Sequence, residues 1–385
     1  MNMNQGDEWM NRLWDTYEIR VGEVRESPFL NRCNVYQDGT TPLFRDVDGV
    51  LWGMSGHSHM GEIAMFRGTS PDDMEKVYPI TTTFAVGHAE RAFDGVRYPE
   101  GVLPRGSIWP FGLYICPVTH RFFCFFHNET GWNGQGSAYD AFGPCETPAF
   151  DSDFRHVGMM HSDDEGRSWS FDRWVLTAHT PCFTEYYNPG AGVAKGQPRG
   201  SISLGSGDFS CFCDLDGGYI YLLYTIIRVN TESRKWESCD AYLARTPIRG
   251  DGLMGDFVKY YEGSFCEAGN LGRETAIARG TWHPRMVWSA LHERYVMVSV
   301  RLTEGGNLPF VDDVLQIRLS EDMLNWSQPV ELMQEGGPFG NHYVAMVPHG
   351  KTGSPFVVEG EEFSFLTNHN GTDVMRYPAR WVKKK

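Results

Sequence analysis

The sequence predicts an all-β fold, and three features of its 385 residues support this prediction. Aromatic residues make up 14% of the chain, which favours strands. Glycine and proline are frequent, at 43 and 21 residues, and both are typical of tight turns. Apolar runs of strand length recur between these turn signals along most of the chain. The composition also excludes intrinsic disorder, because disordered chains have few aromatic residues.

The N-terminal residues form the one predicted helix. Trp9 and Leu13 lie on the same side of a helix over residues 7–18. We therefore interpret residues 1–29 as a short N-terminal helical extension and residues 30–385 as one domain.

The N-terminal segment and the cysteines predict the cellular compartment. The first ten residues are polar and lack the basic and apolar regions of a signal peptide. The nine cysteines are an odd number and show no CxxC spacing of a metal site. Free buried thiols are typical of a reducing compartment, so we expect a cytoplasmic protein.

Five strand modules follow the N-terminal extension. In chain order, the expected strands are 38–44, 51–54 and 63–66; 112–116, 122–127, 157–161 and 169–174; a strand from 209 to the turn at 216–218, then 219–229 and 241–245; 286–289, 295–301 and 314–319; and 343–347, 362–366 and 374–377. A repeat of about 70 residues is the scale of a propeller blade with its loops. The sequence therefore predicts a five-bladed β-propeller rather than two or three separate domains. The insertions at 130–156 and 178–205 are long, and loops of that length are usually functional.

One turn carries a recognisable motif. The segment Ser162–Trp169 resembles the Asp-box, an S-x-D-x-G-x-[ST]-W hairpin of sialidase-like propellers. The Asp164 side chain can bond turn amides, and Gly166 can adopt a positive φ. The segment Ser320–Trp326 resembles a degenerate second copy that lacks the glycine. This motif is a structural staple and not a catalytic site.

The chain more widely resembles five-bladed glycoside hydrolases of the family 43, family 117 and arabinanase kinds. The resemblance lies in the module pattern and in strand phrases at 216–224 and 280–288, and it does not select one family. It implies cleavage of a glycosidic bond in an oligosaccharide. It also implies that an Asp at the place of Asp38 acts as base or nucleophile, although Asp38 could equally cap the turn before Gly39.

Glycoside hydrolysis requires two carboxyl groups that face one bond. In a propeller the innermost strands surround a central funnel, so carboxylates near their starts converge there. Besides Asp38, we therefore predict Glu129 as the general acid and Asp208 as a group that tunes or orients the others. Glu129 follows an apolar strand, where burial would raise its pKa. Glu129 could instead be a solvated acid in a loop, and Asp208 could belong to a simple turn. The acid and base roles could also be exchanged.

Further residues at the expected blade mouths could bind the sugar. Histidines and an arginine can bond hydroxyl groups, and tryptophans can stack on the apolar face of a sugar ring. His127 could in addition orient Glu129. The predicted substrate-binding residues are His57, Trp109, His127, Trp132, Glu267, His283, Arg285 and His342. Each tryptophan, including Trp282, could instead belong to the core.

The charge balance limits the classes of partner. The formal net charge is −15, from 34 basic and 49 acidic residues. Such a surface repels phosphate backbones, so we expect no nucleic-acid partner. No apolar run reaches the roughly 20 residues of a membrane helix, so we expect no membrane partner. We predict no protein-ligated metal and no cofactor, with a central structural cation such as calcium as the alternative.

Two other functions are compatible with these residues. A polysaccharide lyase or sialidase-type enzyme on acidic sugars would use a cation such as Arg285 with Tyr343 or His342. A non-catalytic carbohydrate-binding propeller is the third reading, because a fold does not determine a function.

Overall fold

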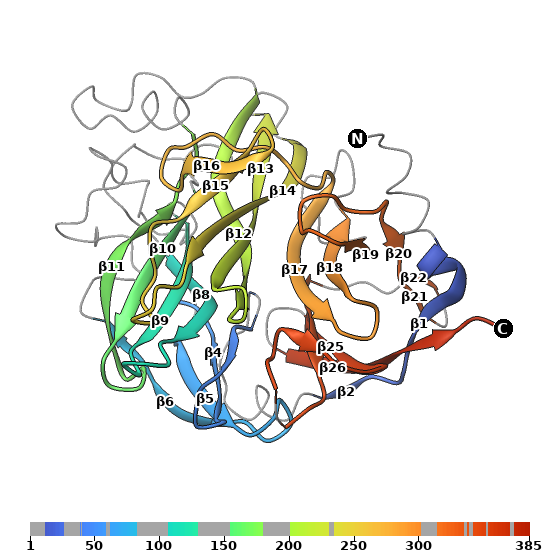
Figure 1. The fold of residues 1–385 in the computed structure, drawn as a ribbon, viewed down its shortest axis with the longest axis horizontal. Helices are drawn as coiled ribbons and strands as arrows, with labels where there is room; N and C mark the ends of the chain where they lie inside the picture. The colour runs from blue at the N-terminus through green and yellow to red at the C-terminus, as the bar shows by residue number, and fades with distance from the viewer. Residues whose placement is uncertain are drawn as a thin grey trace.

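The computed structural model is almost entirely β, which confirms the predicted fold class (Figure 1). It describes residues 12–26, 39, 41–58, 62–82, 107–129, 155–179, 201–230, 235–301, 314–334, 337–338, 342–351, 353–369 and 373–385. Within these ranges, no helix is long and apolar enough to cross a bilayer.

The strands form antiparallel meanders that follow one another along the chain. The first sheet contains β3 (Leu43–Arg45), β4 (Leu51–Ser55), β5 (Ala64–Gly68) and β6 (Glu75–Pro79). A ten-stranded sheet contains β7 (Thr81–Thr82), β8 (Ser107–Ile115), β9 (Phe122–Glu129), β10 (Arg155–Ser162), β11 (Ser168–Leu176), β12 (Ser201–Asp214), β13 (Tyr219–Asn230), β14 (Lys235–Pro247), β15 (Val258–Tyr261) and β16 (Ser264–Ala268). This large sheet is two meanders joined by one parallel contact between β10 and β12.

The C-terminal half contains two further meanders. One sheet holds β17 (Thr281–Ser289), β18 (Arg294–Arg301), β19 (Leu315–Ser320), β20 (Val330–Glu331) and β24 (Val357–Val358). The other holds β23 (His342–Pro348), β25 (Glu362–His369), β26 (Asp373–Lys383), β1 (Tyr17–Val21) and β2 (Arg25–Glu26). The strands β21 (Met333–Gln334) and β22 (Gly337–Pro338) pair with each other.

The first strand of each meander lies at the centre of the molecule. β3 packs against β8, β8 against β12, β12 against β17, and β17 against β23. The ring of Phe111 on β8 lies 5.5 Å from that of Phe209 on β12 and 5.9 Å from that of Tyr343 on β23. The sheets therefore surround a common centre in a propeller-like arrangement, and none of the described sheets closes on itself (Figure 1).

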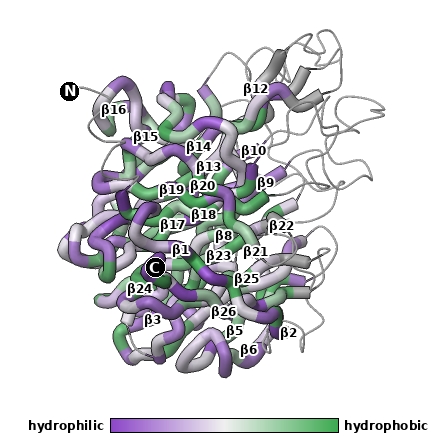
Figure 2. The backbone as a smooth tube through the Cα atoms, turned by 90° about the vertical axis from the view of Figure 1, so that its right-hand side faces the viewer, coloured by the Kyte–Doolittle hydropathy of each residue, from purple (hydrophilic) through white to green (hydrophobic). Residues whose placement is uncertain are grey.

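The core lies between neighbouring sheets. Hydrophobic stretches follow the strands, and hydrophilic residues gather at the turns (Figure 2). Trp169 and Trp381 are fully buried, each in a different apolar cluster. Part of the large aromatic content of the chain therefore belongs to the core.

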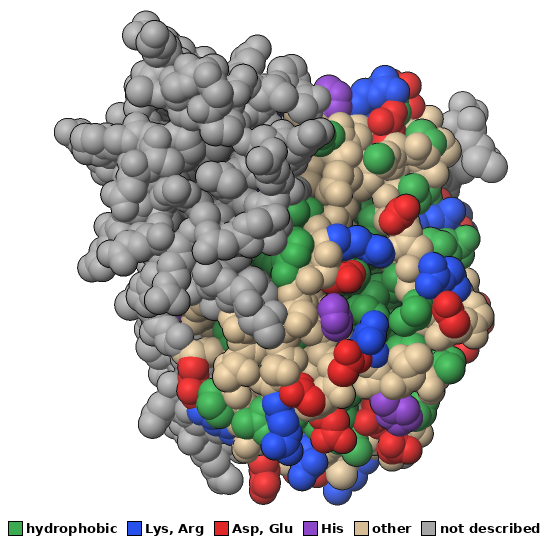
Figure 3. Space-filling view, turned by 90° about the vertical axis from the view of Figure 1, so that its left-hand side faces the viewer, with side chains coloured by type: hydrophobic (Ala, Val, Ile, Leu, Met, Phe, Trp, Pro, Cys, Tyr) green, Lys and Arg blue, Asp and Glu red, His purple; other side chains and the backbone are tan. Residues whose placement is uncertain are grey.

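On the described part of the face in Figure 3, acidic and basic side chains are interspersed over the surface.

The two ends of the chain are paired. Strand β1 runs antiparallel to β26, in register from Tyr17 opposite Lys383 to Val21 opposite Ala379. Residues 12–16 are helical, but residues 17–18, which the sequence analysis placed in the helix, begin β1 instead. These residues pair with β26, and this tertiary pairing overrides the helical pattern. Residues 7–11 lie outside the described residues, and the domain boundary at 29/30 stays a prediction.

The turn from Ser162 to Trp169 makes the contacts that its sequence predicts. The Asp164 carboxylate accepts hydrogen bonds from the Ser168 amide at 2.9 Å and from the Ser162 hydroxyl at 2.7 Å. Gly166 has a φ of 86°, and the indole N–H of Trp169 donates to the Gly166 carbonyl. This turn joins β10 to β11.

The segment after β19 repeats this geometry. Asp322 accepts hydrogen bonds from the amides of Leu324 and Asn325, at 2.9 and 2.8 Å. The indole N–H of Trp326 donates to the Met323 carbonyl, as that of Trp169 does in the first turn. Met323 has a φ of 65°, the left-handed conformation that glycine supplies in the first turn.

Asp164→Ala should lower the free energy of unfolding by about 1–2 kcal/mol, because it leaves turn donors without their acceptor. The matched control is Asp163→Ala, in the same turn. The Asp163 side chain is 64% exposed and, within the described part of the chain, pairs with Arg121. Its loss should cost about 0.5 kcal/mol or less. Urea denaturation of both variants decides, and equal losses would contradict the role given to Asp164.

Candidate functional site

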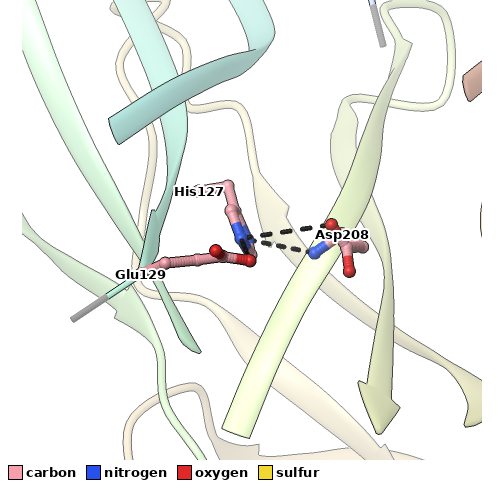
Figure 4. A group of neighbouring side chains, drawn as sticks. All are labelled: His127, Glu129 and Asp208. Atoms are coloured by element: carbon pink, nitrogen blue, oxygen red, sulfur yellow. Dashed lines mark hydrogen bonds and ion pairs between the residues drawn. The ribbon is translucent and has the colours of Figure 1, made fainter. Parts of the chain in front are cut away.

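A buried group of charged side chains lies where β9, β10 and β12 meet (Figure 4). His127 and Glu129 stand two residues apart at the end of β9, so they share one face of the strand. Arg155, the first residue of β10, lies directly opposite Glu129 in the antiparallel register. The exposed fractions of His127, Glu129 and Arg155 are 1, 7 and 7%.

Asp208 reaches this group from β12, because two glycines allow a very close approach of the strands. A Cβ atom on Gly205 would lie 2.3 Å from the Arg155 carbonyl oxygen. A Cβ atom on Gly207 would lie 2.4 Å from Cε1 of His127. Both distances are shorter than any real contact. The close approach of the strands thus explains the glycines before Asp208.

The carboxylate of Asp208 is held by cations and donors. Arg155 Nη1 donates to its Oδ2 at 2.5 Å, and the Trp282 indole N–H lies 3.4 Å from the same oxygen. Its other oxygen, Oδ1, lies 3.7 Å from His283 Nε2 and 4.0 Å from His127 Nε2. Burial alone would raise the pKa of Asp208, but the positive charge of Arg155 outweighs it, and this pKa is lowered to about 2. Asp208 is therefore ionised at neutral pH.

The hydrogen bonds of His127 define its tautomer. The backbone N–H of Asp208 donates to Nδ1 at 3.0 Å, so this nitrogen carries no proton. The proton of the neutral ring then sits on Nε2, which donates to Glu129 Oε1 at 2.9 Å. The Phe111 ring stacks on the imidazole at 5.4 Å and 14°, and Trp109 meets it edge-on. His127 therefore orients Glu129, as the sequence predicts.

The two oxygens of Glu129 differ. Oε1 accepts the bond from His127 and lies 3.2 Å from Arg155 Nε. Oε2 has no partner among the described residues and is not sealed from solvent. One oxygen is thus anchored by His127 and Arg155, and the other is not held by a described residue.

The opposite side of Asp208 is formed by β17 and β23. The His283 ring lies between the rings of Trp282 and Tyr343, with centroid distances of 3.7 and 3.8 Å. Asp208, His283 and Tyr343 all have left-handed backbones, with φ of 39°, 48° and 49°. Each lies at a shift in the register of its strand pair. A bulge in three successive central strands thus turns one side chain towards the centre.

Several predicted residues come together here, and others do not. Glu129, Asp208, His127, His283 and Trp109 form one group, and His57 stacks on Trp109 at 5.3 Å. Arg285 is buried on β17 beside them. Asp38 and Trp132 lie outside the described residues, as does the side chain of His342.

Three expectations need correction. Asp208 does not open its strand but lies in the middle of β12. Glu267 lies on β16, at the far edge of its sheet from β12, and pairs with Arg273. Glu267 was predicted at a blade mouth, but it lies on the outer hairpin that β15 and β16 form. Trp109 and Trp282 are both 3% exposed and pack within the group instead of offering an open stacking platform.

Sequence reasoning missed Arg155. It precedes the predicted strand 157–161 by two residues, and only the register of β9 with β10 reveals that it faces Glu129. The sequence itself shows only that a charged residue precedes an apolar strand, and this does not identify its partner.

Three groups of the site could offer atoms to a cation. One atom each of His127, Glu129 and Asp208 lies within 4.8 Å of the others. However, the Arg155 guanidinium already contacts both carboxylates, and both ring nitrogens of His127 are bonded. A cation would have to displace these interactions, so the arrangement does not fit a metal.

No protein-family model and no curated protein sequence matches the chain. Among solved structures, it is similar to a family 117 glycoside hydrolase of the marine bacterium Zobellia galactanivorans, with 9% identity over 95% of this chain and 90% of that chain and a TM-score of 0.49. It is also similar to an α-L-arabinofuranosidase from Lactobacillus brevis, with 12% identity, 92% and 94% coverage and a TM-score of 0.46. A thermostable family-43 glycoside hydrolase matches with 10% identity, 91% and 92% coverage and a TM-score of 0.40. At identities of 9–12% and TM-scores below 0.5, these similarities do not define the activity of this chain.

Gly207→Ala should destabilise the protein by about 2 kcal/mol or more, because the new methyl group would collide with the His127 ring. Gly250→Ala is the matched control, since a Cβ there meets nothing within 4 Å. It should change the free energy of unfolding by no more than about 0.5 kcal/mol. Denaturant titration of both variants measures the difference. A neutral Gly207→Ala would show that β12 can move away from β9.

The buried His156 should make the fold sensitive to acid. It follows Arg155 on β10, is 0% exposed, and burial lowers its pKa from 6.5 to about 3. Between these pH values the unfolded chain binds a proton that the folded chain does not, so stability falls as pH decreases from 6.5 to 3. His156→Gln should remove a slope on the order of 1 kcal/mol per pH unit from this window. Unfolding free energies at pH 7 and pH 4 test this; an unchanged pH dependence would refute it.

Proposed function

We propose that this protein is a five-bladed β-propeller glycoside hydrolase that cleaves a glycosidic bond in an oligosaccharide. The observation that carries this proposal is the buried group of Glu129, His127, Arg155 and Asp208 at the point where the central strands converge. A carboxyl group that a histidine orients, with an ionised carboxylate nearby, is suited to acid catalysis on a glycosidic oxygen.

The five blades of the proposal correspond to the five meanders along the chain. Their first strands are β3, β8, β12, β17 and β23, which pack in turn around the centre. On this assignment β1 completes the fifth blade by pairing with β26.

Glu129 is proposed as the general acid. Its Oε1 is held by His127 and Arg155, so Oε2 is the atom that would give a proton to the leaving oxygen. Asp208 remains ionised, and its negative charge would stabilise the positive charge that develops on the sugar ring in the transition state.

The second acting carboxyl is proposed to be Asp38. Arg155 bridges Glu129 and Asp208, so these two groups cannot stand on either side of a substrate bond. Gly39, the residue after Asp38, contacts the Phe111 ring that stacks on His127. The chain next to Asp38 therefore enters the same site, which supports a base or nucleophile from this segment.

Glu129→Gln and Asp38→Asn should each lower kcat/KM about 100- to 10,000-fold, since each removes a group that transfers a proton or attacks the sugar. Asp208→Asn should lower it as well. A pooled oligosaccharide screen with mass spectrometry of the products identifies the substrate, and the variants are then measured on it.

The controls for these variants retain the same chemical changes far from the site. Glu267→Gln lies at the outer sheet edge, and Asp163→Asn lies on an exposed turn. Both should keep full activity. If all three site variants turned over the substrate at the wild-type rate, the site would be wrong. If sugars bound without turnover, the chain would be a binding propeller.

A cytoplasmic location remains part of the proposal.

A further inference from the structure

Arg285 is a buried cation that has no acidic partner among the described residues. Its side chain belongs to β17 and is 4% exposed. Nη1 donates to the Thr41 carbonyl at 2.9 Å, and this is its one hydrogen bond to the described residues. Among the described residues, the one titratable group that raises its pKa is the thiol of Cys211.

Other buried cations of the protein are better compensated. Arg155 contacts the carboxylates of Glu129 and Asp208. Lys259 pairs with Glu274 and donates to two backbone carbonyls. Arg318 donates to two backbone carbonyls. Arg285 therefore stands out by having a single neutral acceptor.

The charge of Arg285 persists despite burial. Burial lowers the pKa of this guanidinium to about 10, so it is protonated at neutral pH. A guanidinium has five N–H donors, and burying it without a counter-ion is unfavourable. Its remaining nitrogens are not among the buried atoms that are sealed from solvent. The group that would complete this site is an anion.

The position of Arg285 connects it with the proposed active site. Thr41 precedes β3 and Cys211 lies on β12, so the guanidinium sits among the central strands of three sheets. Two residues earlier on the same strand, His283 lies 3.7 Å from Asp208. The partly exposed Tyr343 stacks on His283 and offers an aromatic face at the same centre.

We propose that Arg285 binds a carboxylate of the substrate, so that the sugar recognised here is a carboxylated one, such as a uronic acid unit. This rests on the proposed glycosidase function. The planar guanidinium matches a carboxylate in a bidentate manner. The net charge of −15 disfavours long polyanions, so a short acidic oligosaccharide is the ligand that a single buried cation would select.

The first test measures binding and does not depend on turnover. Wild-type protein is titrated with glucuronate, glucose and acetate by calorimetry. We expect glucuronate to bind at least about 10-fold more tightly than either, because it offers both the carboxylate and the ring. Glucose binding as tightly as glucuronate would overturn the proposal. Acetate binding as tightly would show an adventitious ion only and would also overturn it.

Variants locate the site. Arg285→Gln should lose this preference for glucuronate, and Arg285→Lys should retain part of it. Arg249→Gln, an exposed arginine that pairs with Asp251, is the matched control and should bind like the wild type. An unchanged preference in Arg285→Gln would refute the assignment. If this variant fails to fold, the wild-type titrations and Arg285→Lys decide.

The second test uses turnover of an acidic oligosaccharide and of the same compound with its carboxyl reduced to an alcohol. We expect the wild type to favour the acidic form at least about 10-fold in kcat/KM, and Arg285→Gln to bring this ratio close to one. Turnover of both forms at equal rates would overturn the carboxylate site alone. Glucuronate binding without any turnover would overturn the glycosidase and leave the carboxylate site standing.

Discussion

The candidate site depends on the bridge that Arg155 makes between Glu129 and Asp208. Two carboxylates that share a buried space repel each other and lose their hydration. A guanidinium can face both, because its donors point in fixed and different directions. The bridge also joins β10 to β12, the single contact that links two meanders into the ten-stranded sheet. The Arg155 side chain thus both compensates the two buried carboxylates and connects the two meanders.

The bridge forms because the central strands depart from regular pairing. Bulges at Asp208, His283 and Tyr343 rotate side chains out of the normal alternation and towards the centre. Left-handed backbones at residues other than glycine are costly, and such strain is often found at functional sites. Glycines supply the remaining space, because only a residue without a Cβ atom at position 207 leaves room for the His127 ring. Strand geometry and ring packing therefore fix the orientation of the His127 ring together.

Most of the fold could be predicted from the sequence, whereas the site could be predicted only in part. Apolar runs located the central strands, because burial on both faces leaves a strong local signal. Strands β6 and β16 were missed, since their half-exposed residues lack that pattern. Glu129, His127 and Asp208 were recognised by chemistry and neighbouring residues. Arg155 could not be, because its meeting with Asp208 depends on a contact between segments 53 residues apart in the chain.

The pairing of β1 with β26 sets a condition on how the molecule can be made. A growing chain releases β1 from the ribosome before β3 to β25 and β26 after them, so the edge of β1 has no partner until β26 emerges. The sheet that contains both strands is therefore the one with the most distant contacts, and such contacts slow folding. The meanders between these strands can form as they emerge, whereas the sheet of β23, β25, β26 and β1 can be completed only after β26 has been made.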